Sequence, residues 1–253
     1  MTWHAALFSG HPEKFHQVYQ PLFVADISSR ISLYPELITP DNIDAHLAHL
    51  KNIEVIFSTW GMFTLTETQL DKLPNLKVIF YAAGATEYFS TPLLARGIKV
   101  VSAWQANAIP VAEFCLAQIL LGCKGYFRNQ REYTGPEFFS ALANNHTAPG
   151  NYQERVALIG AGAISQTLQR LLQPFYLEVL MIPSRPEKRV CSLEQAFSSA
   201  MVISNHLPNR EDNIGVLNGD LFSLMRPGAV FINTGRGLQV NEQELISVLQ
   251  QRP

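Results

Sequence analysis

Two groups of residues in this 253-residue chain have types and spacings that suit the binding of an anion. The first is Gly160-Ala-Gly162, which ends an apolar run and precedes a helical pattern that Ala163 and Ile164 open. In a dinucleotide-binding turn, the first glycine permits the turn and the second lets the backbone approach a pyrophosphate, which then meets the N–H groups of the helix. Ser165 stands where a third glycine is usual, so these residues alone fit a structural strand-to-helix turn equally well.

The second group follows the apolar run Ala229–Asn233 and contains Arg236. Ligands of open α/β sheets bind at the carboxyl ends of the strands, and the planar guanidinium fork matches a carboxylate. We therefore expect Arg236 to hold the carboxylate of a small acid. The alternative is an arginine on a solvated loop.

The end of the next predicted strand, Leu177–Ile182, is where the choice between NAD and NADP can be predicted. An Asp or Glu there would bond the ribose 2′-hydroxyl of NAD, but the chain continues Pro-Ser184-Arg185 without a carboxylate. Ser184 and Arg185, with Lys188 or Arg189, could accept a 2′-phosphate instead, because a guanidinium matches its shape and charge. We predict NADP(H), with NAD(H) as second choice; the alternative for Arg185 is a solvated loop charge.

Small residues also follow the predicted strand Leu76–Tyr81, namely Ala83, Gly84 and Ala85. Residues without bulky side chains allow main-chain N–H groups to reach a carboxylate oxygen. We expect this loop to bind the carboxylate of the substrate. The alternative is an ordinary turn.

The elements that must position these residues follow from hydrophobic periodicity. Strands are predicted at Ala5–Phe8, Ile31–Tyr34, Val55–Ser58, Leu76–Tyr81, Ile98–Ser102, from Arg155, and at Leu177–Ile182, Met201–Asn205 and Ala229–Asn233. Segments of helical spacing alternate with them, including Leu193–Ser199, Asp220–Met225 and Glu242–Gln251. This alternation predicts two α/β domains with parallel sheets, residues 1–101 and 102–253.

Local signals define some boundaries of these elements. Thr39-Pro40 and Thr91-Pro92 each resemble a helix start, and Gly97 resembles a helix terminator. The segment Ile109–Leu121 is apolar nearly all round, which predicts a helix buried on several sides, between domains or at a subunit interface. The region from Tyr133 to about Asn151 lacks periodicity and is expected to be a linker or an arm.

Composition excludes several classes of partner. A net charge of −2 with 16% charged residues gives no basic surface for nucleic acid. The segment Val111–Gly122 is too short to cross a bilayer, so we expect no membrane span. Three cysteines without a secretory signal predict reduced thiols in the cytoplasm. Low charge favours a homodimer, although a monomer with a large core fits equally well.

Four motifs, in this order along the chain, resemble those of one enzyme family. They are Ala82-Ala-Gly-Ala85, Asn107-Ala-Ile-Pro-Val-Ala-Glu113, Asn205-His-Leu-Pro208 and the segment from Met225 to Leu245 around Arg236. The chain is similar to the D-isomer-specific 2-hydroxyacid dehydrogenases, which include phosphoglycerate dehydrogenase and glyoxylate/hydroxypyruvate reductase. The resemblance implies a flavodoxin-like substrate domain followed by a Rossmann domain, a doubly wound parallel sheet that binds the cofactor.

The resemblance also implies a reaction, hydride transfer between NAD(P)H and a small 2-oxo acid or D-2-hydroxy acid. Arg236 would be the catalytic arginine, and Thr234, Gly235 and His206 would lie beside the cofactor. His206 precedes Arg236, whereas the family's proton-donating histidine follows the arginine motif in a Pro-His loop, with a glutamate between them. These two residues would lie beyond Pro253, so we expect a fragment of a longer dehydrogenase whose second sheet lacks its C-terminal strands.

Two alternative functions remain at this point. One is a non-catalytic dinucleotide-binding protein similar to the C-terminal-binding corepressors of the same superfamily. The other is an inactive fragment of such a dehydrogenase.

Overall fold

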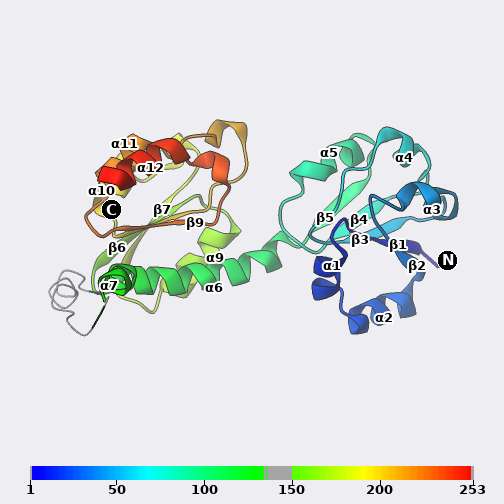
Figure 1. Cartoon of the computed structure of the whole chain (residues 1–253), viewed down its shortest axis with the longest axis horizontal. Helices are drawn as coiled ribbons and strands as arrows, with labels where there is room; N and C mark the ends of the chain where they lie inside the picture. Colours follow the sequence, from blue (N-terminus) through cyan, green and yellow to red (C-terminus); the bar gives the residue numbers. More distant parts are fainter. Residues whose placement is uncertain (1, 134, 136–149, 252–253) are drawn as a thin grey trace. The chain divides into compact units, whose positions relative to one another are not determined.

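The computed structural model describes residues 2–133, 135 and 150–251, and it divides the chain into two compact units, Met1–Asn107 and Ala108–Pro253 (Figure 1). Each unit contains one parallel β-sheet with helices, so the α/β architecture expected from the sequence is confirmed. Most of the predicted linker, residues 136–149, lies outside the described residues.

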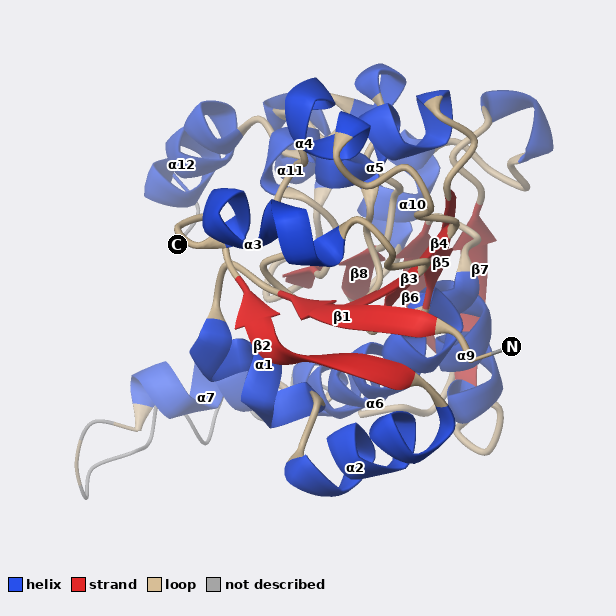
Figure 2. Ribbon diagram, turned by 90° about the vertical axis from the view of Figure 1, so that its right-hand side faces the viewer, coloured by secondary structure: helices blue, strands red, loops and turns tan. Residues whose placement is uncertain are grey.

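The first unit contains a five-stranded parallel sheet in the order β2-β1-β3-β4-β5, which is the flavodoxin-like order. Its strands are β1 (His4–Phe8), β2 (Ser32–Ile38), β3 (Val55–Ser58), β4 (Val78–Tyr81) and β5 (Lys99–Ser102). Its helices are α1 (Pro12–Val18), α2 (Pro21–Arg30), α3 (Ile43–Leu50), α4 (Glu67–Asp71) and α5 (Glu87–Ala95). Figure 2 shows α3, α4 and α5 on one face of this sheet and α1 and α2 on the other.

Alternation along β1 explains why both faces of this sheet are covered. Ala6 and Phe8 belong to the larger core cluster, whereas Leu7 belongs to a second cluster with Phe15 of α1 and Tyr19. Successive side chains of a strand point to opposite faces, so a strand that is apolar at every position requires helices on both.

The second unit contains a four-stranded parallel sheet in the order β7-β6-β8-β9. Its strands are β6 (Glu154–Ile159), β7 (Leu177–Ile182), β8 (Val202–Asn205) and β9 (Val230–Asn233). Its helices are α7 (Tyr126–Glu132), α9 (Ala163–Leu172), α10 (Leu193–Ser199), α11 (Gly219–Leu224) and α12 (Glu242–Gln251). The chain passes from β6 to β7 on one side and later to β8 on the other. The strand order therefore reverses at β6, and the crevice at its carboxyl end is where open α/β sheets bind ligands.

Helix α6 (Trp104–Cys123) begins in the first unit and continues along the sheet of the second. Its buried residues recur every three or four positions and include Ala112, Cys115 and Ile119, which join the core cluster of Val156 and Leu158. By length and composition alone α6 could cross a membrane, a test that core helices also pass. The sequence predicted burial on several sides, but within this chain one face is buried.

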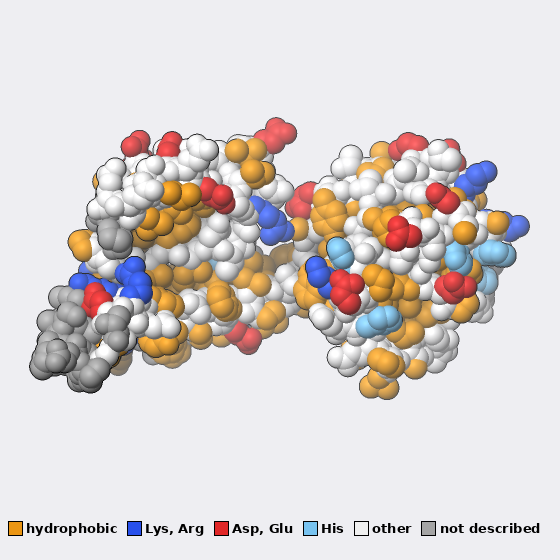
Figure 3. All heavy atoms as spheres, in the orientation of Figure 1, with side chains coloured by type: hydrophobic (Ala, Val, Ile, Leu, Met, Phe, Trp, Pro, Cys, Tyr) orange, Lys and Arg blue, Asp and Glu red, His pale blue; other side chains and the backbone are white. Residues whose placement is uncertain are grey.

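The positions of α6 outside this buried face leave large apolar side chains exposed. Ile109 is 50% exposed, Phe114 is 54% exposed and Leu121 is 36% exposed. Figure 3 shows apolar side chains at the surface of the second unit on the side in view. Hydrophobic composition therefore predicted the apolar character of this helix but not which of its faces the chain itself would cover.

Two predicted helix starts are wrong. α5 begins at Glu87 and contains Pro92, which cannot bond the carbonyl of Tyr88; that carbonyl accepts a hydrogen bond from Thr64 Oγ1 (2.9 Å) instead. The helix ends before Gly97, whose φ of +74° suits a terminating glycine, as predicted.

The helix expected after Thr39-Pro40 also begins later, at Ile43. The side-chain oxygen of Asn42 accepts from the main-chain nitrogen of Thr39 (2.8 Å), and its side-chain nitrogen donates to the carbonyl of Leu37 (3.0 Å). The asparagine thus closes a turn over Thr39 and Pro40 before the helix starts.

Candidate functional site

The turn after β6 is shaped by Gly160. Its φ is +103°, and a Cβ at this position would lie 2.6 Å from the main-chain oxygen of His206. A side chain is therefore excluded both by the backbone conformation and by the neighbouring chain. The turn packs directly against the main chain that follows β8, at the point where the strand order reverses.

Gly162 lies on the open side of the same turn. It is the N-cap of α9 and makes no side-chain cap, and no heavy atom among the described residues lies within 4 Å of where its Cβ would be. Space is thus left above the first turn of α9, where the main-chain N–H groups of Ala163 and Ile164 and the helix dipole favour an anion. This open turn fits the pyrophosphate of a dinucleotide.

Ser165 stands in place of the third glycine, in the first turn of α9. It is fully buried, and its hydroxyl is the one buried side-chain oxygen or nitrogen in the described part of the chain without a hydrogen-bond partner. A serine is small enough for close helix-to-strand packing, but its unpartnered hydroxyl has a desolvation cost.

His206 follows β8 and is only 7% exposed. Its Nδ1 lies 2.7 Å from Thr234 Oγ1, and its Nε2 lies 2.9 Å from Ser204 Oγ. The Thr234 hydroxyl itself donates to the carbonyl of Asn205 (3.3 Å). This chain of bonds is satisfied when Nδ1 carries the proton and Nε2 accepts from Ser204.

Burial lowers the pKa of His206 from 6.5 to about 4. The imidazole is therefore neutral at pH 7, and both of its nitrogens are already bonded to protein groups. The sequence predicted that His206 lies beside the cofactor rather than at the proton-transfer step; in the structure its main-chain oxygen packs against Gly160 of the glycine turn.

Arg236 lies in the loop after β9 and is exposed. Its guanidinium makes one long contact, Nη1 to the carbonyl of Gly235 (3.4 Å), and it has no carboxylate partner among the described residues. Beneath the loop, the buried side chain of Gln239 accepts from the main-chain nitrogen of Arg236, and Asn233 Oδ1 accepts from that of Gly235; the buried side chain of Asn205 bonds both of these acceptors. Arg236 is thus a free cation on a fixed loop at the carboxyl end of the sheet.

The sequence did not identify the role of Gln239. A signal was present, because Gln239 is a polar residue between Leu238 and Val240 in the segment that resembles the arginine motif. Only the structure shows that Gln239 is buried, with 1% of its surface exposed.

The loop after β7 holds the candidate 2′-phosphate residues. Ser184 is half-buried and Arg185 is exposed. Arg189 turns back to the loop, where its guanidinium donates to the carbonyls of Pro183 (3.0 Å) and Ser184 (2.9 Å). Arg189 therefore stabilises the conformation of the loop, and the exposed Arg185 is the arginine available to bind an anion.

The carboxylate-binding loop expected in the first unit follows β4. Ala83 is buried, and Thr59 Oγ1 donates to the carbonyl of Ala82 (3.1 Å), which ties this loop to the one after β3. A Cβ on Gly84 would lie 3.2 Å from Asn107 Nδ2, so a larger residue would displace that side chain. Ala83, Gly84 and Ala85 thus lie at the carboxyl edge of the first sheet.

The predicted residues of the second unit gather at the carboxyl edge of its own sheet. The glycine turn follows β6, Ser184 and Arg185 follow β7, His206 follows β8, and Thr234, Gly235 and Arg236 follow β9. Such an edge can hold a phosphorylated nucleotide through main-chain N–H groups and an anionic substrate through an arginine.

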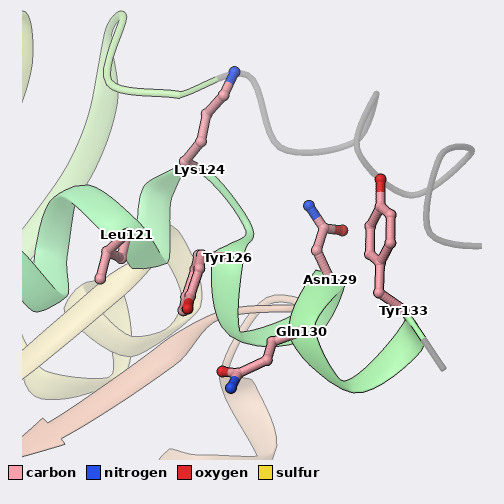
Figure 4. A pocket seen from close by; sticks show the side chains of 6 residues that line it. All are labelled: Leu121, Lys124, Tyr126, Asn129, Gln130 and Tyr133. Carbon is pink, nitrogen blue, oxygen red and sulfur yellow. The ribbon is translucent and has the colours of Figure 1, made fainter.

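A cavity of about 360 Å³ lies elsewhere (Figure 4). Its lining residues are Leu121, Lys124, Tyr126, Asn129, Gln130 and Tyr133. A Cβ on Gly122 would touch Val202 and Val230, the first residues of β8 and β9, so this end of α6 lies at the amino ends of the strands. The cavity is therefore on the edge of the sheet opposite to Arg236.

Comparison with known proteins agrees with the geometry. Residues 116–253, more than half of the chain, match the family described as "D-isomer specific 2-hydroxyacid dehydrogenase, NAD binding domain". The putative 2-hydroxyacid dehydrogenase YoaD of Bacillus subtilis (strain 168) is 34% identical over 196 residues, which cover 74% of this chain and 57% of that protein. Glyoxylate/hydroxypyruvate reductase B of Yersinia pestis (strain Pestoides F) is 26% identical over 223 residues, 84% of this chain and 68% of that protein.

Solved structures share the fold. The holo form of D-mandelate dehydrogenase from Rhodotorula graminis superposes with a TM-score of 0.77 at 20% identity, over 100% of this chain and 79% of the other. D-2-hydroxyisocaproate dehydrogenase gives a TM-score of 0.75 at 22% identity, over 98% of this chain and 76% of the other. The chain thus spans little more than half of the Bacillus relative and about three quarters of these structures.

Proposed function

The chain belongs to the D-isomer-specific 2-hydroxyacid dehydrogenase family, and from this premise we propose that it is an oxidoreductase of small 2-oxo acids and D-2-hydroxy acids. A nicotinamide dinucleotide would bind at the carboxyl edge of the second sheet and supply or accept the hydride. The observation that carries the proposal is the guanidinium of Arg236, which forms no ion pair with any described residue and is on the same sheet edge as the open turn at Gly162.

Arg236 would act on the substrate in two ways. Its fork can bind the carboxylate through two parallel hydrogen bonds, and its charge stabilises the negative charge that develops on the C2 oxygen as the hydride arrives. His206 does not supply the proton in this account, because it is neutral and bonded at both nitrogens. The main-chain N–H groups of Ala83, Gly84 and Ala85 are the second proposed contact of the substrate carboxylate.

NADP(H) is the proposed cofactor, with NAD(H) as second choice. Support comes from the end of β7 and residues 183–185, which contain no carboxylate for a ribose 2′-hydroxyl; Ser184 and the exposed Arg185 lie there, and Arg185 forms no ion pair among the described residues. A 2′-phosphate would find in Arg185 the charge and geometry that it requires.

We propose further that the protein acts in the cytoplasm as a homodimer. The support for a dimer is the exposed apolar face of α6, which contains Ile109, Phe114 and Leu121. Exposed apolar side chains that gather into a patch are typical of a protein contact surface.

The test is steady-state oxidation of NADPH by a panel of small 2-oxo acids, with the wild-type chain and two variants. Arg236→Ala should lose on the order of a hundredfold or more in turnover, as expected for removal of a charge-stabilising donor. Arg170→Ala, on the outer surface of α9, is the matched control and should retain full activity. Nucleotide-dependent self-association without turnover would instead favour a non-catalytic dinucleotide-binding protein.

A further inference from the structure

Two buried carboxamides lie beneath the loop that presents Arg236. Asn205 is fully buried at the end of β8, and Gln239 is buried between β9 and α12. Their side chains bond each other, Asn205 Nδ2 to Gln239 Oε1, at 2.7 Å. Burying an amide costs free energy unless its donors and acceptors form hydrogen bonds. The hydrogen-bond partners of this pair therefore indicate what the pair stabilises.

Every donor of the two amides is used. Gln239 Nε2 donates to the carbonyls of Leu207 (2.8 Å) and Pro208 (2.9 Å), in the loop after β8. Asn205 Nδ2 donates its second hydrogen to Asn233 Oδ1 (3.0 Å) at the end of β9. The pair therefore joins the loops that follow two neighbouring strands.

Of the two acceptors of the pair, Asn205 Oδ1 accepts from the main-chain nitrogen of Leu207 (3.2 Å), and Gln239 Oε1 faces the arginine loop together with the side chain of Asn233. Gln239 Oε1 accepts from the main-chain nitrogen of Arg236 (3.3 Å), and Asn233 Oδ1 accepts from that of Gly235 (3.0 Å). A Cβ on Gly235 would lie 2.7 Å from Asn205 Nδ2, so the loop rests directly on the amides. No charged group is required to hold Arg236 in place, and its guanidinium stays available.

The same pair is connected to the dinucleotide turn. Gln239 donates to the carbonyls of Leu207 and Pro208, which immediately follow His206. The carbonyl oxygen of His206 is the atom against which Gly160 packs. A continuous set of contacts thus runs from the glycine turn through residues 206–208 to Gln239 and then to Arg236.

We propose that Gln239 is a positioning residue, which fixes Arg236 relative to the dinucleotide turn and so sets where a 2-oxo acid is held. This inference rests on the proposed function for its substrate. An amide is needed because the position requires two donors toward carbonyls and one acceptor toward an N–H group. Leucine supplies neither, and an ionised glutamate would direct acceptors at two carbonyl oxygens.

The first experiment measures backbone hydrogen exchange of residues 234–238 by mass spectrometry. Gln239→Leu should raise their exchange rate by roughly tenfold, since a buried hydrogen-bonded bridge is lost. The control is Asn213→Leu: Asn213 is also buried and donates to the same carbonyl of Pro208 (2.9 Å), but it makes no bond to the arginine loop. Equal changes in both variants, or none in Gln239→Leu, would overturn the proposal. This readout does not depend on activity.

The second experiment separates positioning from general destabilisation by kinetics. Gln239→Leu should raise KM for the 2-oxo acid and lower kcat, each by roughly tenfold, while the dissociation constant of NADPH stays within about twofold of wild type. Gln239→Glu should regain activity relative to wild type as the pH falls, because a protonated carboxyl restores an acceptor and one donor. Unchanged KM and kcat in Gln239→Leu would overturn the inference. A wild-type chain inactive on every 2-oxo acid would instead contradict the proposed function, and the exchange rates would still decide the role of Gln239.

Discussion

The Cβ that Gly160 lacks would lie 2.6 Å from the main-chain oxygen of His206. This contact joins the ends of β6 and β8, the two strands between which the strand order reverses. The glycine turn is thus part of the packing of the sheet as well as a place for an anion. Its two glycines have different surroundings, and this difference can be tested.

Gly160→Ala should destabilise the fold, whereas Gly162→Ala should not. The first puts a methyl group against a carbonyl at a φ of +103°, a strain of roughly 1–3 kcal/mol or more. The second places its methyl group in open space, where it would obstruct only a bound pyrophosphate. Thermal unfolding and NADPH titration of both variants check this. A Gly162→Ala protein that binds NADPH as tightly as wild type would contradict the assignment of the turn.

Arg185→Ala should weaken NADPH binding by about tenfold, or roughly 1.4 kcal/mol, and leave NADH binding unchanged. The reason is that only NADPH has the 2′-phosphate. Fluorescence titration with both reduced cofactors measures the two dissociation constants. If the affinities for NADPH and NADH fall by the same factor, Arg185 does not bind the 2′-phosphate.

His206 should make the protein less stable as the pH falls from about 6.5 to about 4. In this window the unfolded chain takes up a proton at the ordinary pKa of 6.5, whereas the folded protein resists until about 4 because the imidazole is buried. The linked loss of stability is about 3 kcal/mol when fully developed. Urea unfolding at a series of pH values measures it.

His206→Gln is the control for this pH dependence, because it removes the titrating ring. Carboxylates with lowered pKa values, such as those of Glu54 and Asp212, lose their stabilising contributions below about pH 4.5. The interval from 6.5 to 4.5 therefore isolates the histidine. An equal slope in wild type and variant over this interval would show that another group is responsible.

Ser165→Ala should leave stability unchanged or raise it by about 1 kcal/mol. The hydroxyl is buried without a partner, so its removal relieves a desolvation cost, and the smaller side chain keeps the close approach of α9 to the sheet. The denaturant midpoint of unfolding gives the result. A marked loss of stability would mean that the hydroxyl has a partner in solution.

The strands could be read from the sequence because their apolar runs are short and bounded by polar or turn residues. Val55–Ser58 and Leu177–Ile182 agree with the structure at both ends. The helix expected to start at Thr91 failed because a proline inside a helix is tolerated when another group takes the freed carbonyl. Here Thr64, which is 24 residues from Tyr88, does so, and no local pattern contains that information.

The residues of the candidate site also fall into those that the sequence predicts and those that it does not. The glycine turn and Arg236 are visible in the sequence because their residue types and local spacing express their chemistry. The bond between Asn205 and Gln239 joins residues 34 positions apart, and it depends on the pairing of β8 with β9 and on the loop that follows. Such a bond exists only once the sheet has formed.

The measurement that tests the central claim most directly is a two-step calorimetric titration of the wild-type chain and of Arg236→Ala. NADPH is added first, followed by oxamate, an unreactive analogue of a small 2-oxo acid. We predict that both proteins bind NADPH and that only the wild-type protein then binds oxamate. Failure of the wild-type chain to bind NADPH or NADH, or equal binding of oxamate by both proteins, would contradict the account.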